Sequence, residues 1–225
     1  MIHLPFADRL EAGRLLADEL ALRRIGRRAV VLSLARGGVP VGFGVADHLH
    51  LPLDVIVARK LGVPWQPELA MGAIAGEARI LDDRIIRALR ISDEDVEQII
   101  VREQAEMRRR EELYRAGAQA LDLSGQTAIL IDDGLATGST MRAAVRHVRS
   151  FKPSKVIIGI PVGSRDACAG LRGEVDELIC LAAPELFLAV GKWYRNFQEV
   201  SDTEVQNFLA EARRRLTTYL SSQAA

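Results

Sequence analysis

Polar and apolar residues follow two patterns along most of this chain. Short, nearly continuous apolar runs bounded by charged residues or glycine are typical of strands buried on both faces. Longer segments in which apolar residues return every three to four positions are typical of amphipathic helices. The apolar runs predict strands at 29–34, 53–58, 127–133, 155–162 and 175–181. The helical periodicity predicts helices at 8–25, 39–50, 91–117, 138–151, 164–172 and 201–220.

The order of these elements predicts the fold class. Strands that alternate with helices are typical of an α/β protein with a doubly wound, mostly parallel sheet covered by helices on both faces. Residues 71–83 depart from this order, because they alternate around Gly76-Glu77 and therefore predict a hairpin. No repeat, low-complexity segment or linker interrupts the chain, so we interpret residues 1–225 as a single domain.

Composition narrows the class of protein further. The chain has 225 residues and a formal net charge of zero, which argues against a nucleic-acid or membrane partner. No apolar run approaches the roughly 18 residues of a membrane span, and the first residues do not resemble a signal peptide. The two cysteines, Cys168 and Cys180, are too few for a disulfide framework or a metal set. These features predict a cytoplasmic location.

The stretch "ILIDDGLATGST" (129–140) carries the clearest chemistry. In parallel sheets, ligands bind outside the carboxyl ends of the strands, and this loop follows such an end. A helix beginning near Gly138 would point free N–H groups at the loop, and Thr137, Ser139 and Thr140 add hydroxyls. The spacing matches neither a Walker loop nor a dinucleotide-binding loop. The loop therefore predicts a phosphate site.

Asp132 and Asp133, which precede this loop, need a different partner. Adjacent strand residues point to opposite faces, so the two acids are poorly placed as a facing acid/base pair. At the strand end, however, both can accept hydrogen bonds from the vicinal hydroxyls of one small polyol. A phosphate in the loop and a diol on the acids describe a ribose 5-phosphate. The alternative interpretation is that Asp133 only caps the turn and Asp132 is solvated.

This stretch resembles, position for position through Met141, the phosphoribosyl pyrophosphate signature of the type I phosphoribosyltransferases. The resemblance implies a core at 28–60 and 125–181 and a small hood, which we expect from residues 1–8 and 182–200. It also implies displacement of pyrophosphate from the ribose by a small nitrogenous base. Mg2+ would be held mainly by the substrate, with Asp132 and Asp133 as candidate ligands. A homodimer stays open.

Two further loops gain roles from the resemblance. Arg36, Gly37 and Gly38 follow the first strand and correspond to the family's pyrophosphate loop, which often contains a strained peptide bond. An ordinary β-to-α turn is the alternative. Arg59 and Lys60 follow the second strand and would neutralise pyrophosphate or reach the base. The implied catalytic residues are then Asp132, Asp133, Arg36 and Lys60. A regulatory protein that binds the same ligand without turnover is the alternative function.

The identity of the base is less readable. Enzymes for 6-oxopurines carry an aspartate where this chain has Ala136, which argues against hypoxanthine and guanine. Trp193 or Tyr194 would stack on the base, or else form apolar core in the hood.

A helical segment of about thirty residues, 84–117, is an insertion relative to the family. Ser92 and Asp95 predict a cap near its start. Its three arginines, 108–110, would close over the phosphates or, as we favour, form a solvated helix face; an RNA-binding helix is a third, weaker interpretation. Residues 62–69 are our candidate for the mobile catalytic loop.

Overall fold

A five-stranded parallel sheet forms the centre of the protein. The computed structural model describes residues 3–23, 25–26, 28–115 and 122–223. The strand order is β2-β1-β6-β7-β8, and every neighbouring pair is parallel, which confirms the predicted fold class. The strands are β1 (Ala29–Leu34), β2 (Leu53–Ile56), β6 (Thr127–Ile131), β7 (Lys155–Val162) and β8 (Glu177–Ala182).

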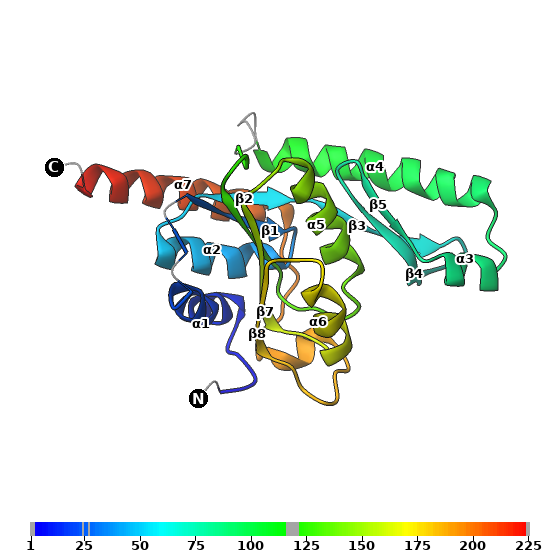
Figure 1. Ribbon diagram of the computed structural model, residues 1–225, viewed down its shortest axis with the longest axis horizontal. Helices are drawn as coiled ribbons and strands as arrows, with labels where there is room; N and C mark the ends of the chain where they lie inside the picture. Colours follow the sequence, from blue (N-terminus) through cyan, green and yellow to red (C-terminus); the bar gives the residue numbers. More distant parts are fainter. Residues whose placement is uncertain (1–2, 24, 27, 116–121, 224–225) are drawn as a thin grey trace.

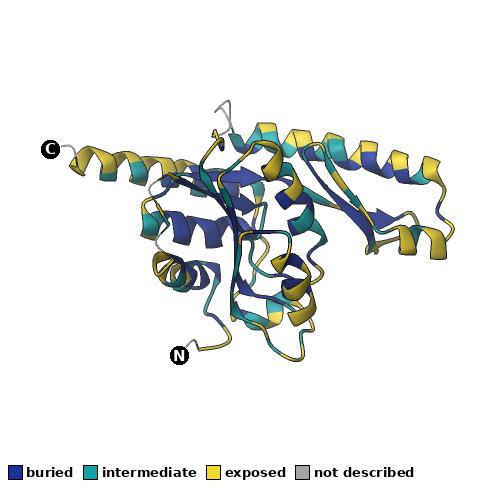
Figure 2. Cartoon of the chain, viewed as in Figure 1, coloured by how far each residue is buried: buried dark blue, intermediate teal, exposed yellow. Residues whose placement is uncertain are grey.

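Helices cover both faces of this sheet (Figure 1). Odd-numbered strand residues such as Val31 and Ile129 lie in one apolar cluster, with α1 (Arg9–Ala21), α2 (Gly38–Leu49) and α7 (Asp202–Gln223). Even-numbered residues such as Val30 and Leu130 lie in a second cluster, with α5 (Ser139–Ser150) and α6 (Arg165–Arg172). Successive strand side chains point to opposite faces, so continuous apolar runs supply two cores at once. Figure 2 accordingly shows the central strands buried along most of their length.

A second, antiparallel sheet forms a small hood that projects from the core toward the right of Figure 1; it is built from residues 58–81, whereas the hood expected from the sequence comprised residues 1–8 and 182–200. Its strands are β3 (Ala58–Val63), β4 (Gln66–Ala75) and β5 (Ala78–Leu81), in the order β3-β4-β5. The turn between β4 and β5 confirms the hairpin predicted around Gly76. The predicted strand 53–58 was too long: β2 ends at Ile56, and Ala58 pairs with Ala75 of β4. Arg59 and Lys60 therefore belong to the hood sheet and not to the end of a parallel strand.

The inserted helical segment comprises α3 (Asp83–Ala88) and α4 (Asp93–Arg115). Asp95 N donates to Ser92 Oγ over 3.1 Å, and that hydroxyl donates to the Asp95 carboxylate over 2.7 Å, which confirms the predicted cap. The expected helix end at Gly117 lies outside the described residues. In the described part of the chain, no helix has the length and apolar character needed to cross a membrane.

Two segments far apart in sequence meet beside the core. Phe6 N donates to Trp193 O over 2.9 Å, and Arg195 N donates to Phe6 O over 2.8 Å. A short 3-10 helix, η1 (Val190–Trp193), precedes this contact. Phe6, Ala12, Val162 and Tyr194 form a small buried apolar cluster there. Residues 62–69 form the turn between β3 and β4 with the adjoining strand ends, and their mobility stays a prediction.

Candidate active site

Asp132 and Asp133 lie directly after β6, at the carboxyl end of the central sheet. Asp132 Oδ1 accepts a hydrogen bond from Asp133 N over 2.9 Å. Asp133 Oδ2 accepts one from Arg9 Nε over 2.8 Å, and the exposed fractions of these two side chains are only 10% for Arg9 and 14% for Asp133. The sequence did not predict Arg9 as a site residue, because an arginine at the start of an amphipathic helix carries no signal of its partner.

Arg9 and Asp133 are enclosed by aromatic side chains. The Arg9 guanidinium lies 3.7 Å from the ring centroid of Phe197, and its Nη1 donates to Gln198 O over 2.9 Å. Tyr194 is buried and donates its hydroxyl proton to Asp133 O over 2.5 Å. Its ring packs against Phe197 at a centroid distance of 5.1 Å. Tyr194 therefore supports the acidic residues and offers no free ring face for a base.

Burial raises the pKa of both acidic side chains. The pKa of Asp132 lies well above its ordinary value because the carboxyl group is desolvated, and the neighbouring Asp133 charge raises it further. Desolvation also raises the pKa of Asp133, while the Arg9 guanidinium partly offsets that shift. Two adjacent carboxyl groups that resist ionisation are stabilised by a proton, a cation or hydroxyl donors. Strongly perturbed acids at a strand end are typical of functional sites.

The loop after β1 touches the acidic residues directly. A Cβ added at Gly37 would lie 2.1 Å from Asp133 Oδ2. A Cβ at Gly38 would lie 2.8 Å from Ile131 O and 2.9 Å from Asp132 Cα. At Gly38 a side chain would meet backbone atoms, so glycine is required there, whereas a side chain at Gly37 would displace the Asp133 carboxylate. The peptide bond between Ala35 and Arg36 is cis.

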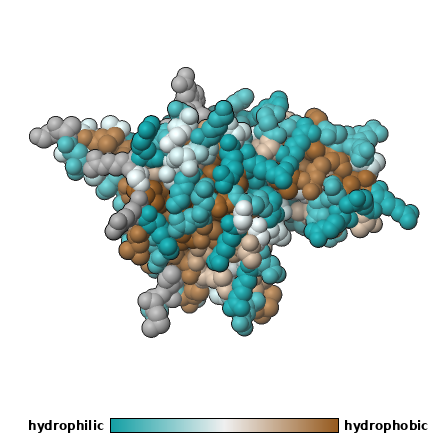
Figure 3. Space-filling view, in the orientation of Figure 1, coloured by the Kyte–Doolittle hydropathy of each residue, from teal (hydrophilic) through white to brown (hydrophobic). Residues whose placement is uncertain are grey.

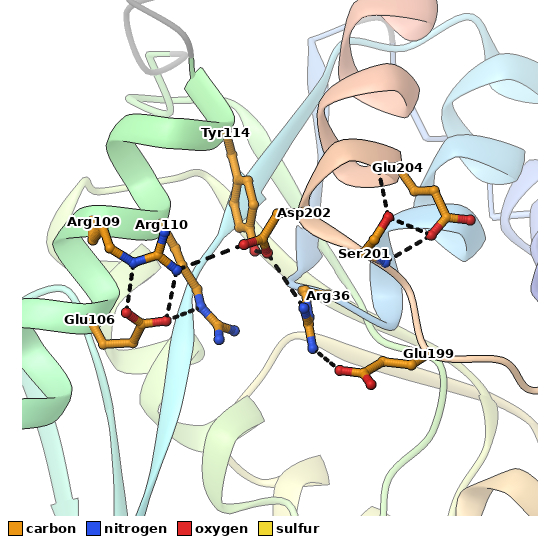
Figure 4. Close-up of polar contacts among 9 residues, drawn as sticks. All are labelled: Arg36, Glu106, Arg109, Arg110, Tyr114, Glu199, Ser201, Asp202 and Glu204. Carbon is orange, nitrogen blue, oxygen red and sulfur yellow. Dashed lines mark hydrogen bonds and ion pairs between the residues drawn. The ribbon is translucent and has the colours of Figure 1, made fainter.

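Arg36 connects this loop to α7. Its guanidinium forms an ion pair with Glu199, and its Nη1 lies 3.6 Å from Asp202 Oδ1 at the start of α7 (Figure 4). A cavity of about 360 Å3 is lined by Arg9, Arg36, Gly37, Asp133 and Glu199, together with Phe197 and Val200. Arg36 thus lines the same cavity as Asp133.

The inserted helix reaches Arg36 through Asp202. Tyr114, buried near the end of α4, donates its hydroxyl proton to Asp202 Oδ1 over 2.6 Å. Desolvation and this hydrogen bond raise the pKa of Tyr114 to about 12. Arg109 Nη2 lies 3.7 Å from Asp202 Oδ2, and Arg109 also pairs with Glu106.

Arg110 likewise pairs with Glu106, over 2.6 Å (Figure 4). Arg108 and Arg109 are exposed, as expected for a solvated helix face, whereas Arg110 is half-buried. The guanidinium groups of Arg109 and Arg110 also join the polar network between α4 and α7. Of the three, only Arg108 is exposed without such a contact among the described residues.

The predicted phosphate loop leads into α5. Gly138 has φ +81°, a left-handed conformation, and α5 begins at the next residue, Ser139. Thr137 Oγ1 lies 3.4 Å from Ser139 Oγ. Ala136 and Thr137 are exposed, and Ser164 Oγ donates to Ala136 O over 2.7 Å. Thr140 lies in the first turn of α5. The helix start expected near Gly138 is confirmed.

The remaining predicted residues have partners elsewhere. Arg59 donates twice to Glu103 of α4, over 2.9 and 2.7 Å, and this carboxylate is buried. The exposed Lys60 donates to Glu68 O over 2.9 Å. Trp193 Nε1 is buried and has no hydrogen-bond partner among the described residues. The structure therefore brings together the acids, Arg36 and the two glycines, whereas no hydrogen bond or ion pair joins Arg59, Lys60 or Trp193 to them in the described part of the chain.

Known proteins resemble this chain along most of its length. Residues 8–179 match the family model described as "Phosphoribosyl transferase domain". The chain is 46% identical, over 93% of its length, to a protein of Mycobacterium tuberculosis H37Rv named "Putative phosphoribosyl transferase". It spans 47% of that relative's length, so it covers about half of the curated relatives that it matches.

Solved structures resemble the chain as well. The crystal structure of TT1426 from Thermus thermophilus is 38% identical, with a TM-score of 0.77, and the match covers 92% of this chain and 98% of that one. The AQ2163 protein of Aquifex aeolicus is only 13% identical, with a TM-score of 0.50 over 78% of this chain and 74% of that one, so it supports the fold alone.

Proposed function

Since this chain belongs to the phosphoribosyl transferase domain family, we propose that it transfers 5-phosphoribose from phosphoribosyl pyrophosphate to a nitrogenous base, with release of pyrophosphate. The observation that carries the proposal is the contact between the loop after β1 and the two half-buried, desolvated acids after β6. This contact places a guanidinium, two carboxylates and a glycine-containing helix start around one end of the sheet.

Asp132 and Asp133 are proposed to hold the ribose. Their carboxylates accept hydrogen bonds from the 2- and 3-hydroxyls, in addition to the bonds that Asp132 accepts from Asp133 N and Asp133 accepts from Arg9 Nε in the free protein. Departure of pyrophosphate leaves positive charge on the ribose ring. When they are ionised, the two carboxylates held beside that ring favour the charged transition state over the neutral ring of the ground state, because no solvent has to reorganise.

The two ends of the substrate carry phosphates, and each has a proposed partner. Residues 136–140 receive the 5-phosphate through N–H groups and hydroxyls at the start of α5. Arg36 receives the leaving pyrophosphate, and exchanges its contacts with Glu199 and Asp202 for contacts with phosphate oxygens. Catalysis then consists mainly of positioning and electrostatic stabilisation.

The donor set also fits Mg2+. The described residues contain no group of three or more His, Cys, Asp or Glu that could hold a metal ion, so a cage of protein ligands is absent from that part of the chain. Mg2+ commonly binds through one or two carboxylates together with substrate phosphates and water. Asp132 and Asp133 would supply those carboxylates. When bound, the ion would neutralise charge on the pyrophosphate.

The acceptor is proposed to be a base other than hypoxanthine or guanine. Ala136 is exposed beside the phosphate loop and presents a methyl group where a carboxylate would bond the N7 edge of a 6-oxopurine. Leaving that edge unpaired costs roughly 1–3 kcal/mol, which is one to two decades in relative rate. Initial rates with adenine, uracil, orotate, hypoxanthine and guanine decide the question, and a preference for either 6-oxopurine would refute this part.

The central test is calorimetry with phosphoribosyl pyrophosphate and Mg2+. We expect Asp132→Asn with Asp133→Asn to lose binding; because the change also removes the ion pair with Arg9, far-UV circular dichroism first verifies that the variant is folded. Asp18→Asn with Asp166→Asn is the matched control, since both of these acids are exposed and distant in sequence from the site. Equal affinity in the two double variants would refute the ribose assignment. Tight binding by the unmodified protein without turnover of any base would instead indicate a regulatory ligand sensor.

A further inference from the structure

A second polar cavity borders the candidate active site at one residue, Ser139. It measures about 460 Å3 and lies between α3, the β4–β5 hairpin and α5. It shares no lining residue with the cavity of about 360 Å3 that Arg36 and Asp133 line. Six charged residues line it, namely Asp82, Asp83, Arg84, Arg87, Arg142 and Arg146.

The charge of this cavity is positive. Its four arginines and two aspartates leave a formal surplus of two positive charges. Figure 3 shows hydrophilic side chains gathered over the middle of the viewed face, where α5 lies. A net charge of zero for the whole chain therefore conceals a local concentration of guanidinium groups.

Two of the arginines have no carboxylate partner among the described residues. Arg146, on α5, makes no hydrogen bond or ion pair with any of them, and Arg87, on α3, donates only to the backbone oxygen of Asp83, over 3.1 Å. By contrast, Arg142 is held by Glu174 at 2.6 Å, and Arg84 pairs with Asp82 at 3.3 Å. Unpaired guanidinium groups thus approach the cavity from two different helices.

These donors indicate the chemistry of a ligand. A guanidinium presents a planar set of N–H donors that match phosphate oxygens in pairs. Arginines on two walls suit a ligand with more than one phosphate group better than a single phosphate. The volume falls within the range of sites for small molecules. We propose that this cavity is a second site, which binds a small molecule carrying a diphosphate or longer phosphate chain.

The site is connected to the phosphate loop through one residue. Ser139 lines the cavity and is also the first residue of α5, directly after Gly138. Occupation of the cavity therefore alters the first turn of the helix that receives the 5-phosphate. This consequence rests on the proposed function, whereas binding of the phosphate chain does not. A ligand there would change the affinity for phosphoribosyl pyrophosphate, and that substrate would change its affinity reciprocally.

The test is calorimetric titration with inorganic pyrophosphate. Arg87→Gln with Arg146→Gln removes the two unpaired charges, and both residues are exposed, so the fold is retained. Arg108→Gln with Arg213→Gln removes the same charge from exposed positions outside both cavities. We expect the first double variant to lose one binding event or to weaken it by about tenfold or more, which is about 1.4 kcal/mol. The control should match the unmodified protein.

Two outcomes overturn the proposal. One is equal pyrophosphate binding in both double variants and the unmodified protein. The other is binding of single-stranded RNA with no binding of small phosphates. Titration with ADP and GDP distinguishes the two ligand sources. If a nucleotide binds more tightly than pyrophosphate, and the variant with both Arg87 and Arg146 replaced loses that binding, the ligand is a nucleoside diphosphate. If the nucleotides and pyrophosphate bind with equal affinity, the ligand is a free phosphate chain. Failure of the proposed function is seen separately, as unchanged substrate binding when Asp132 and Asp133 are replaced.

Discussion

Two arginine–carboxylate pairs flank the candidate site, and they differ mainly in burial. Arg9 and Asp133 have exposed side-chain fractions of 10% and 14%. Arg36 and Glu199 have fractions of 25% and 80%. The first pair is enclosed by Phe197 and by the Tyr194 hydroxyl, which bonds Asp133 O. Both pairs line the same cavity, but only the second has a largely exposed carboxylate.

The difference in burial separates two roles for the same chemistry. Removing one partner of a buried pair leaves a desolvated charge, so such a pair must stay intact. An exposed pair contributes about 0–1 kcal/mol, because water or a ligand replaces either partner at little cost. We therefore interpret Arg9 as a permanent support for the acids and Arg36 as an exchangeable anion receptor. The four predictions that follow test this comparison.

The largest effect is expected from Arg9→Met. This change keeps an unbranched side chain beside Phe197 but leaves Asp133 buried without its cation. We expect the free energy of unfolding to fall by about 3–5 kcal/mol in urea titrations near neutral pH. Arg14→Met, on the exposed side of the same helix, should change stability by less than about 0.5 kcal/mol. Similar losses of stability in the two variants would show that the buried ion pair contributes no more to stability than an exposed arginine.

The contact between the two loops should be the next most sensitive. Gly37→Ala places a methyl group 2.1 Å from Asp133 Oδ2, so either the loop or the carboxylate must move. We expect a loss of about 1–3 kcal/mol in stability, together with weaker binding of phosphoribosyl pyrophosphate. Gly173→Ala is the control, since its added Cβ meets nothing within 4 Å. Normal stability and binding in Gly37→Ala would mean that the loops need not touch.

The raised pKa values of the acids predict an effect of pH on stability. In the folded protein Asp132 and Asp133 bind protons more readily than in the unfolded chain. Their contribution therefore becomes more favourable as pH falls through the raised native pKa values, and levels off below the ordinary value of about 4. A tenfold change in a proton-binding constant between the folded and unfolded states corresponds to about 1.4 kcal/mol of stability.

The measurement is the difference in unfolding free energy between the unmodified protein and Asp132→Asn with Asp133→Asn, followed from neutral to acidic pH. The subtraction cancels the other carboxyl groups, such as Glu106, whose pKa is lowered to about 2 by its bonds to Arg109 and Arg110. The unmodified protein should gain stability relative to the variant as pH falls. A difference that stays constant across this range would contradict the raised pKa values.

The smallest effect on stability is expected from Glu199→Gln. The exposed carboxylate competes with an anionic ligand for Arg36, so its neutralisation should change stability by less than about 1 kcal/mol. Affinity for pyrophosphate should increase several-fold in calorimetry. Glu112→Gln, an exposed acid on α4, removes the same charge at a distance from Arg36. An increase of equal size in that control would attribute the effect to net charge alone.

The sequence by itself determined the parts of the molecule that depend on neighbouring residues. Parallel strands buried on both faces require continuous apolar runs, so the central sheet could be read directly, with limits close to those observed. The acids, the glycine at φ +81° and the start of α5 lie in one short stretch, and their geometry follows from that stretch alone. The Arg36-Gly37-Gly38 loop could likewise be identified from a few consecutive residues.

Only the tertiary structure decided which charges pair. Arg9 and Asp133 are 124 positions apart, Arg36 and Glu199 are 163 apart, and Arg59 and Glu103 are 44 apart. The break between Ile56 and Ala58 could not be predicted for a related reason. The residues of a strand do not indicate which neighbouring strand will form hydrogen bonds with its backbone. Apolar residues repeat with the period of their own helix or strand, but an ion pair has no period. Its partners are set by how the elements pack, and burial then decides whether the pair is permanent or exchangeable.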